Sequence, residues 1–243
     1  EEGDVNWEEY YRNVGADMDV HTFYAMRQTR NGILVAGGTN SGVALLVNVT
    51  NEGEIIWSQP YYPPDGDGNQ VNFRSIISYR DGFAMVGENF TRIANEWASW
   101  YWFVHIAENG EIIWNRSFNI GALLGSQIKI LYSIAALPDG GLVGVGNGHP
   151  RINDGIIIKI NKIGELQWFQ TYPFLPGDRE GFYAKTFYSA LSHPEGGVIA
   201  VGQGKGRDSG GDVEPGGFLL KLVPERSAPI ILSYIPDKIE LSV

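Results

Sequence analysis

The sequence contains no cysteine, which excludes a disulfide framework, a thiol nucleophile and a thiolate metal site. It also lacks any apolar run close to the roughly 20 residues that a transmembrane helix requires. Positive charge is scarce, because 18 Lys and Arg oppose 28 Asp and Glu for a net charge of -10. Nucleic acids and anionic membrane surfaces select basic patches, so we expect neither as a partner.

Internal repetition is what the sequence does have. Successive copies of one pattern are separated by 50, 58 and 56 residues. The start of the pattern lies at Phe23, Phe73, Leu131 and Phe187, and its first turn lies at Asn31, Asp81, Asp139 and Glu195. Because the offset between these two landmarks is constant, the insertions lie between fixed strands. A period near 50 residues built from short strands is typical of β-propeller blades.

Each repeat predicts four strands, with first strands over 22–28, 72–79, 130–137 and 186–192. The fourth strands carry Trp followed four residues later by an aromatic, as in Trp57 and Tyr61, Trp114 and Phe118, and Trp168 and Tyr172. In the last repeat Ile230 and Tyr234 hold these places. The sequence therefore predicts an all-β fold, a single β-propeller domain over 1–243, with four-stranded antiparallel blades over about 21–62, 72–118, 130–172 and 186–235.

The N-terminal segment adds a spare strand, because Trp7 and Tyr11 show the same spacing before any first strand has occurred. We predict a strand over 5–12. An unpaired edge invites association, so this strand either closes the propeller or completes a blade in a neighbouring molecule. A third alternative is that the chain is part of a larger ring.

The combined pattern resembles a known repeat family. It reads Asp-Gly-Gly, an apolar strand ending in Val-x-Gly, a strand such as Ile157-Ile158-Lys159-Ile160, and then Gly-Glu-x-x-Trp-x-x-x-Tyr. This is similar to the Trp-containing β-propeller repeats of secreted and cell-surface proteins of bacteria and archaea. The resemblance covers nearly the whole chain and is best over 130–172. It implies surface location and a binding or scaffolding role, and it transfers no catalytic residue.

Three glycosylation sequons occur, at Asn48, Asn89 and Asn115. Asn48 occupies a third-strand position where we expect side chains to meet solvent, and Asn89 is placed on a long loop. The chain begins at Glu1 instead of Met, from which we expect that a leader or a neighbouring domain has been removed. Together these features predict an extracellular or cell-surface glycoprotein.

Candidate ligand-binding residues lie in the long connections, which emerge at one end of each sheet and are dissimilar. The segment 89–102 contributes Trp97, Trp100 and Trp102, which suit sugar stacking or a protein partner when exposed. The alternative is that Trp100 and Trp102 begin a third strand and pack between blades. Asp154, Asp178 and Asp208 lie in other long connections and could serve as a general acid and base, although such acidic loops are usually only solvated.

The segment Asp65, Asp67 and Asn69 spaces oxygen ligands as the front of a calcium loop does. Gln70 and Ile76 stand where that loop would place Gly and Glu, so a looser calcium site and a plain acidic turn are the alternatives. We expect no other cofactor. The sequence as a whole predicts a noncatalytic binding or assembly module whose partner is a glycan, a protein or the chain itself. The alternative is a glycan-directed hydrolase or lyase that uses carboxylates on the long connections.

Overall fold

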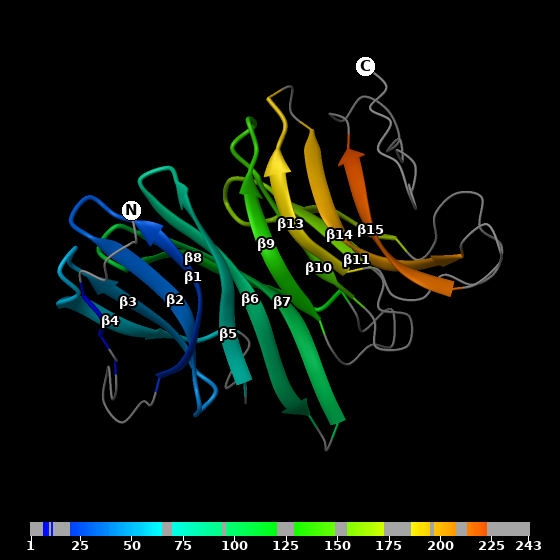
Figure 1. The fold of residues 1–243 in the computed structure, drawn as a ribbon. Helices are drawn as coiled ribbons and strands as arrows, with labels where there is room; N and C mark the ends of the chain where they lie inside the picture. The colour runs from blue at the N-terminus through cyan, green and yellow to red at the C-terminus, as the bar shows by residue number, and fades with distance from the viewer. Residues whose placement is uncertain are drawn as a thin grey trace, which may run out of the picture. The chain divides into compact units, whose positions relative to one another are not determined.

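The computed structural model describes residues 7–9, 11, 20–64, 70–93, 96–120, 129–148, 155–172, 186–194, 197–207 and 213–222. The chain divides into two compact units, Glu1–Phe118 and Asn119–Val243. The regular structure of the described residues is β-strand, in four antiparallel sheets (Figure 1). No helix long and apolar enough to cross a membrane occurs in this part of the chain.

The first unit holds two four-stranded sheets in which neighbours in sequence are neighbours in space (Figure 1). One sheet consists of β1 (Val20–Gln28), β2 (Ile33–Thr39), β3 (Ala44–Val49) and β4 (Ile55–Tyr61). The other consists of β5 (Gln70–Tyr79), β6 (Gly82–Ile93), β7 (Glu96–Ala107) and β8 (Ile112–Phe118). Strand β5 lies against β1, β2 and β3, so the two sheets of this unit pack on one another.

The second unit repeats this arrangement. One sheet contains β9 (Ile130–Ala136), β10 (Leu142–Asn147), β11 (Gly155–Ile160) and β12 (Leu166–Tyr172). The other contains β13 (Thr186–Ser192), β14 (Val198–Arg207) and β15 (Val213–Leu222), and β13 lies against β9, β10 and β11. The fourth strand predicted near 229–235 lies outside the described residues.

The predicted fold class, an all-β fold of antiparallel blades of the β-propeller type, is confirmed, and each predicted repeat contains one sheet. The fourth strands share one register: Trp57, Trp114 and Trp168 stand opposite Asn48, His105 and Lys159. A register shift follows each of these three pairs. The predicted equivalence of the three tryptophans is therefore confirmed.

Each unit has an apolar core to which both of its sheets contribute. In the first unit, Leu46 and Tyr61 of one sheet belong to the same buried cluster as Phe73, Met85 and Trp102 of the other. In the second unit, the buried cluster joins residues of β10, β11 and β12 to residues of β13, β14 and β15. Because apolar side chains of both sheets are removed from water together, face-to-face packing of sheets is the main stabilising contact within each unit.

The first strand of every sheet carries a β-bulge at the same place. In β1, Phe23 pairs with Gly37 and Ala25 pairs with Ala36, so that Tyr24 is the extra residue. The equivalent extra residues in β5, β9 and β13 are Arg74, Tyr132 and Tyr188. A bulge bends the strand and re-aims the side chain of the extra residue. The four repeats therefore present one large side chain each at an equivalent, re-aimed position.

A glycine in the second strand makes each bulge sterically allowed. A Cβ added at Gly37, Gly87, Gly146 or Gly202 would overlap a backbone carbonyl oxygen of the first strand, that of Thr22, Asn72, Ile130 or Thr186 respectively. Glycine in a strand interior often marks such a close backbone approach. The glycine that follows the apolar run of each second strand is thus a requirement of the bulge.

The expectation that Asn48 faces solvent is wrong, because Asn48, His105 and Lys159 are all buried. Asn48 lies on the same face of β3 as Leu46, and the second sheet covers that face. Lys159 pairs with Asp139 at 2.9 Å. Burial alone would raise the pKa of Asp139, but the hydrogen bond and charge of Lys159 hold it below its usual value.

Because glycine is required only opposite the bulge, alanine substitutions at two glycines of one sheet should differ in their effect on stability. Gly202→Ala in β14 should lower the free energy of unfolding by about 1–3 kcal/mol, because the new methyl group meets the Thr186 carbonyl. Gly217→Ala in β15 is the matched control, since the nearest atom to its new Cβ lies 3.9 Å away. Denaturant unfolding followed by tryptophan fluorescence measures both. Equal stabilities of the two variants would contradict the steric explanation.

His105 predicts a pH dependence of stability. Its ring is buried between Tyr79 at 4.8 Å and Trp114 at 5.5 Å. Burial lowers the pKa of His105, Asp81 opposes this shift, and Arg80 adds to it. The unfolded chain, with a His pKa of about 6.5, therefore binds the proton first, and stability should fall as the pH drops below that value.

His105→Asn introduces the residue that the first repeat has at this position, Asn48. We expect this variant to lose part of the decline in unfolding free energy between about pH 6.5 and pH 5. Urea titrations across this pH range measure the decline. An unchanged pH profile in the variant would show that His105 does not cause it.

Candidate ligand-binding edges

The bulged residues form two clusters, one in each unit, at the first-strand edges of the sheets. In the first unit, the Arg74 guanidinium lies 3.9 Å from the centre of the Tyr24 ring. The Arg74 Nη2 donates to the Glu88 Oε1 at 2.6 Å, and the Asn72 Nδ2 donates to the same oxygen at 3.0 Å. The Glu88 carboxylate is buried, whereas Tyr24 is 42% exposed. This arrangement holds a charge-compensated guanidinium beside an accessible aromatic ring.

In the second unit, both bulged residues are tyrosines, Tyr132 and Tyr188. The Tyr132 and Tyr188 rings lie 5.5 Å apart at 57°, and Tyr188 is 49% exposed. The Tyr188 hydroxyl donates to the Gln203 Oε1 at 3.3 Å, and the Ser133 hydroxyl accepts from the Ala190 amide at 3.2 Å. This edge therefore combines aromatic rings with hydroxyl and amide groups.

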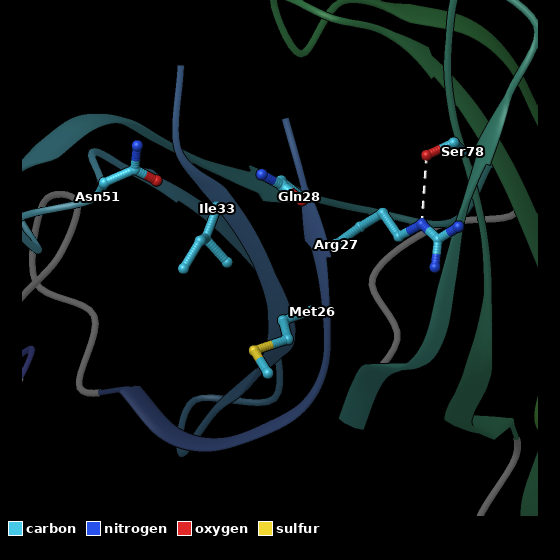
Figure 2. Close-up of a pocket in the computed structure, with 6 residues that line it drawn as sticks. All are labelled: Met26, Arg27, Gln28, Ile33, Asn51 and Ser78. Atoms are coloured by element: carbon cyan, nitrogen blue, oxygen red, sulfur yellow. Dashed lines mark hydrogen bonds between the residues drawn. The ribbon is translucent and has the colours of Figure 1, made fainter. Parts of the chain in front are cut away.

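A cavity of about 740 Å³ lies near one end of β1 in the first unit (Figure 2). It is lined by Met26, Arg27, Gln28, Ile33, Asn51 and Ser78. Figure 2 shows Arg27 extending from β1 toward Ser78 of β5, and the Arg27 Nε donates to the Ser78 hydroxyl at 3.2 Å. The cavity therefore offers amide, hydroxyl and guanidinium groups beside the apolar side chains of Met26 and Ile33.

Sequence reasoning missed a buried cation in the second unit. The Lys129 side chain precedes β9 and is almost completely buried, and its Nζ lies 3.2 Å from the Asn119 Oδ1. Burial lowers the pKa of Lys129 to about 8. No repeat landmark falls on this residue, so the sequence offered no signal for it. An amine with a lowered pKa is a potential base or nucleophile, but burial closes Lys129 to a substrate.

The tryptophans predicted as an exposed ligand surface are placed differently. Trp100 and Trp102 lie within β7 and are buried, which agrees with the alternative prediction that they begin a third strand. Trp102 stacks on Phe73 with centroids 4.6 Å apart, and its Nε1 donates to the Asn115 Oδ1 at 2.6 Å. These two residues are therefore core residues and cannot stack on a ligand. Trp97 also belongs to β7, but its side chain lies outside the described part.

The remaining predicted ligands cannot be placed. Asp154, Asp178 and Asp208 lie outside the described residues, as do Asp65, Asp67 and Asn69 of the predicted calcium loop. Among the residues that are described, no three or more His, Cys, Asp or Glu side chains form a group that could hold a metal ion.

The sequon asparagines lie in strands. Asn89 belongs to β6, where a loop was expected, and both Asn89 and Asn48 are buried. Asn115 lies in β8 and keeps part of its surface exposed, while its Nδ2 donates to the Tyr62 carbonyl at 2.7 Å. The solvent exposure on which the glycosylation prediction rested is thus absent at two of the sites.

The chain is similar to several solved structures, whereas no protein-family profile and no curated protein match its sequence. The chain is similar to the Dos1 propeller, with a TM-score of 0.46 and 15% identity over 81% of this chain and 46% of that chain. It spans less than half of the Dos1 propeller chain.

Two further solved structures show a comparable degree of likeness. One is a protein of unknown function from Bacteroides caccae, with a TM-score of 0.40 and 15% identity over 81% of this chain and 70% of that chain. The other is the GH43 endo-arabinanase from Bacillus licheniformis, with a TM-score of 0.44 and 11% identity over 87% and 74%. None of these three similarities indicates an activity for this chain.

Proposed function

We propose that the protein is a noncatalytic β-propeller binding module whose first-strand edges bind a neutral glycan outside the cell. The observation that carries this proposal is the bulge at the same position of all four first strands. Three of the four extra residues are tyrosines and the fourth is Arg74, which stacks on one of them. A purely structural edge strand has no need of a large ring or guanidinium there.

The chemistry of the edges favours a sugar. Aromatic rings provide flat apolar surfaces, and the Tyr188 hydroxyl, the Gln203 amide and the Arg74 guanidinium provide hydrogen-bonding groups beside them. Glu88 already compensates the charge of Arg74, and the chain carries a net charge of -10. An anionic ligand would therefore gain little from Arg74 and would be repelled overall.

Extracellular location is part of the proposal and rests on the resemblance to secreted propeller repeats. The same edges could accept a peptide, because exposed tyrosines are frequent in protein interfaces. We favour a glycan because the hydrogen-bonding groups surround the rings. The hydrolase alternative stays a prediction, since it depends on carboxylates that the structure does not describe.

The proposal is tested by probing a microarray of neutral oligosaccharides with the purified chain, and then titrating the strongest hit. Tyr24→Ala and Tyr188→Ala should each weaken binding by about five-fold or more, since truncating a central interface aromatic costs more than about 1 kcal/mol. Tyr62→Ala is the matched control, because Tyr62 is 47% exposed but lies outside the bulges. Circular dichroism should show unchanged folding of all three variants.

Two results would count against the proposal. One is a chain that binds no neutral oligosaccharide but captures members of a peptide library through Tyr24 and Tyr188, which would identify a peptide site instead. The other is an equal loss of glycan binding in all three tyrosine variants, which would place the glycan away from the first-strand edges.

A further inference from the structure

The chain contains three Asn-Gly pairs, Asn31-Gly32, Asn109-Gly110 and Asn147-Gly148. In such a pair the backbone nitrogen of the glycine can attack the side-chain carbonyl carbon of the asparagine, because glycine has no Cβ that would block the approach. The attack requires that the glycine amide loses its proton and that the asparagine side chain turns toward it. Hydrogen bonds that hold either group therefore slow the reaction. All three glycines are buried, so the exposure of the glycine does not distinguish the pairs.

The pair in the turn after β7 is held by two hydrogen bonds. The Gly110 amide donates to the Ala107 carbonyl at 3.0 Å, and the Asn109 Oδ1 accepts from the Glu111 amide at 3.1 Å. The first bond keeps the proton on the nitrogen that would attack, and the second keeps the side chain turned toward Glu111. Both bonds have to break before the reaction can begin, so this pair is protected.

The pair at the end of β10 is held by the neighbouring strands. Asn147 is the last residue of β10 and pairs with Ile130 of β9 and Gly155 of β11. The Asn147 Oδ1 accepts from the Ile130 amide at 3.1 Å. Because strands on both sides fix the backbone and one of them also holds the side chain, this pair is protected too.

The pair in the turn between β1 and β2 has no such restraint. Gly32 uses its carbonyl to accept from the Thr29 amide at 2.9 Å. Within the described part of the chain, no hydrogen bond involves the Gly32 amide or the Asn31 side chain, and Asn31 is exposed. The two groups that must change before the reaction, the glycine amide and the asparagine side chain, are therefore not held by bonding.

We propose that Asn31 is a site of spontaneous deamidation in the folded protein. The Gly32 backbone nitrogen gives its proton to the solvent and forms a bond to the Asn31 Cγ. The bond from Cγ to Nδ2 then breaks, and the side-chain nitrogen leaves as ammonia. Water opens the resulting cyclic imide at either of its two carbonyl carbons. One opening gives aspartate, and the other gives isoaspartate, in which the backbone runs through the former side chain.

The two products fit the turn differently. Aspartate is the residue that the second and third repeats have at the equivalent position, Asp81 and Asp139, so this turn accommodates it. Isoaspartate adds a methylene group to the backbone of the turn that joins Gln28 to Ile33. These two residues pair across the hairpin and line the cavity in Figure 2. Isoaspartate should therefore distort this hairpin, and both products add one negative charge to the chain.

The test follows the purified full chain during incubation at a mildly alkaline pH, because loss of the amide proton makes the reaction faster as the pH rises. Samples taken over time are digested, and the peptides that contain Asn31, Asn109 and Asn147 are analysed by mass spectrometry. We expect Asn31 to convert at least several-fold faster than either of the other two. Asn31→Gln is the control, since its longer side chain closes the imide ring much more slowly. The acidic species separated by ion exchange should disappear in this variant.

The same incubation in guanidinium chloride separates the effect of the fold from that of the local sequence. The unfolded chain has lost the hydrogen bonds at Asn109 and Asn147, so the three rates should become comparable. Equal rates in the folded chain would overturn the proposal, because the bonds would then give no protection. A preference for Asn31 that persists unchanged in the unfolded chain would also overturn it, since the residues beside the pair would then be the cause.

Discussion

In the first unit, a tyrosine four residues after a tryptophan donates a hydrogen bond to the carbonyl oxygen of a turn glycine in the sheet that it packs against. Tyr61 makes this bond to Gly110 and Tyr11 makes it to Gly53, each at 2.7 Å. Burial raises the pKa of Tyr61, so its hydroxyl stays protonated and remains a donor. Glycine at the turn lets the tryptophan ring of the same strand approach closely. In the first unit, Trp57 and Tyr61 therefore connect neighbouring sheets, and stability in such arrays is set by nearest-neighbour contacts.

A second constraint acts inside each sheet and gives the repeats their common edge. Because the second strand has glycine here, a carbonyl oxygen of the first strand can approach it closely. This close approach allows the bulge, and the bulge changes the direction of the extra residue's side chain. The backbone is thus the same in all four repeats, while the extra side chain is free to differ. Arg74 stands where the other three repeats have tyrosine. Variation at a fixed, partly exposed position is what a binding surface requires.

The strands could be predicted well from the sequence because the same pattern of strands and turns occurs in four repeats. All four first strands agree with the predicted ranges within two residues at each end. The bulges were not predicted, because a single extra residue does not disturb a period of about 50 residues, although the glycine after each second strand's apolar run was their signal. The segment 89–102 was read as a loop because it interrupts the pattern, whereas β6 and β7 simply extend their pairing through it. At the turn after β5, the residue with positive φ is Arg80, a choice that local sequence does not reveal.

The polar third-strand position shows how the repeats adjust to burial. Asn48, His105 and Lys159 all face the fourth-strand tryptophan, and all are buried. Two of them differ in how burial is accommodated. Lys159 forms an ion pair with Asp139, whereas burial lowers the pKa of His105, whose ring packs between two aromatic rings. Lys159 and its carboxylate partner Asp139 occur in the same repeat, so that repeat holds a buried cation without altering the backbone on which the neighbouring sheet docks.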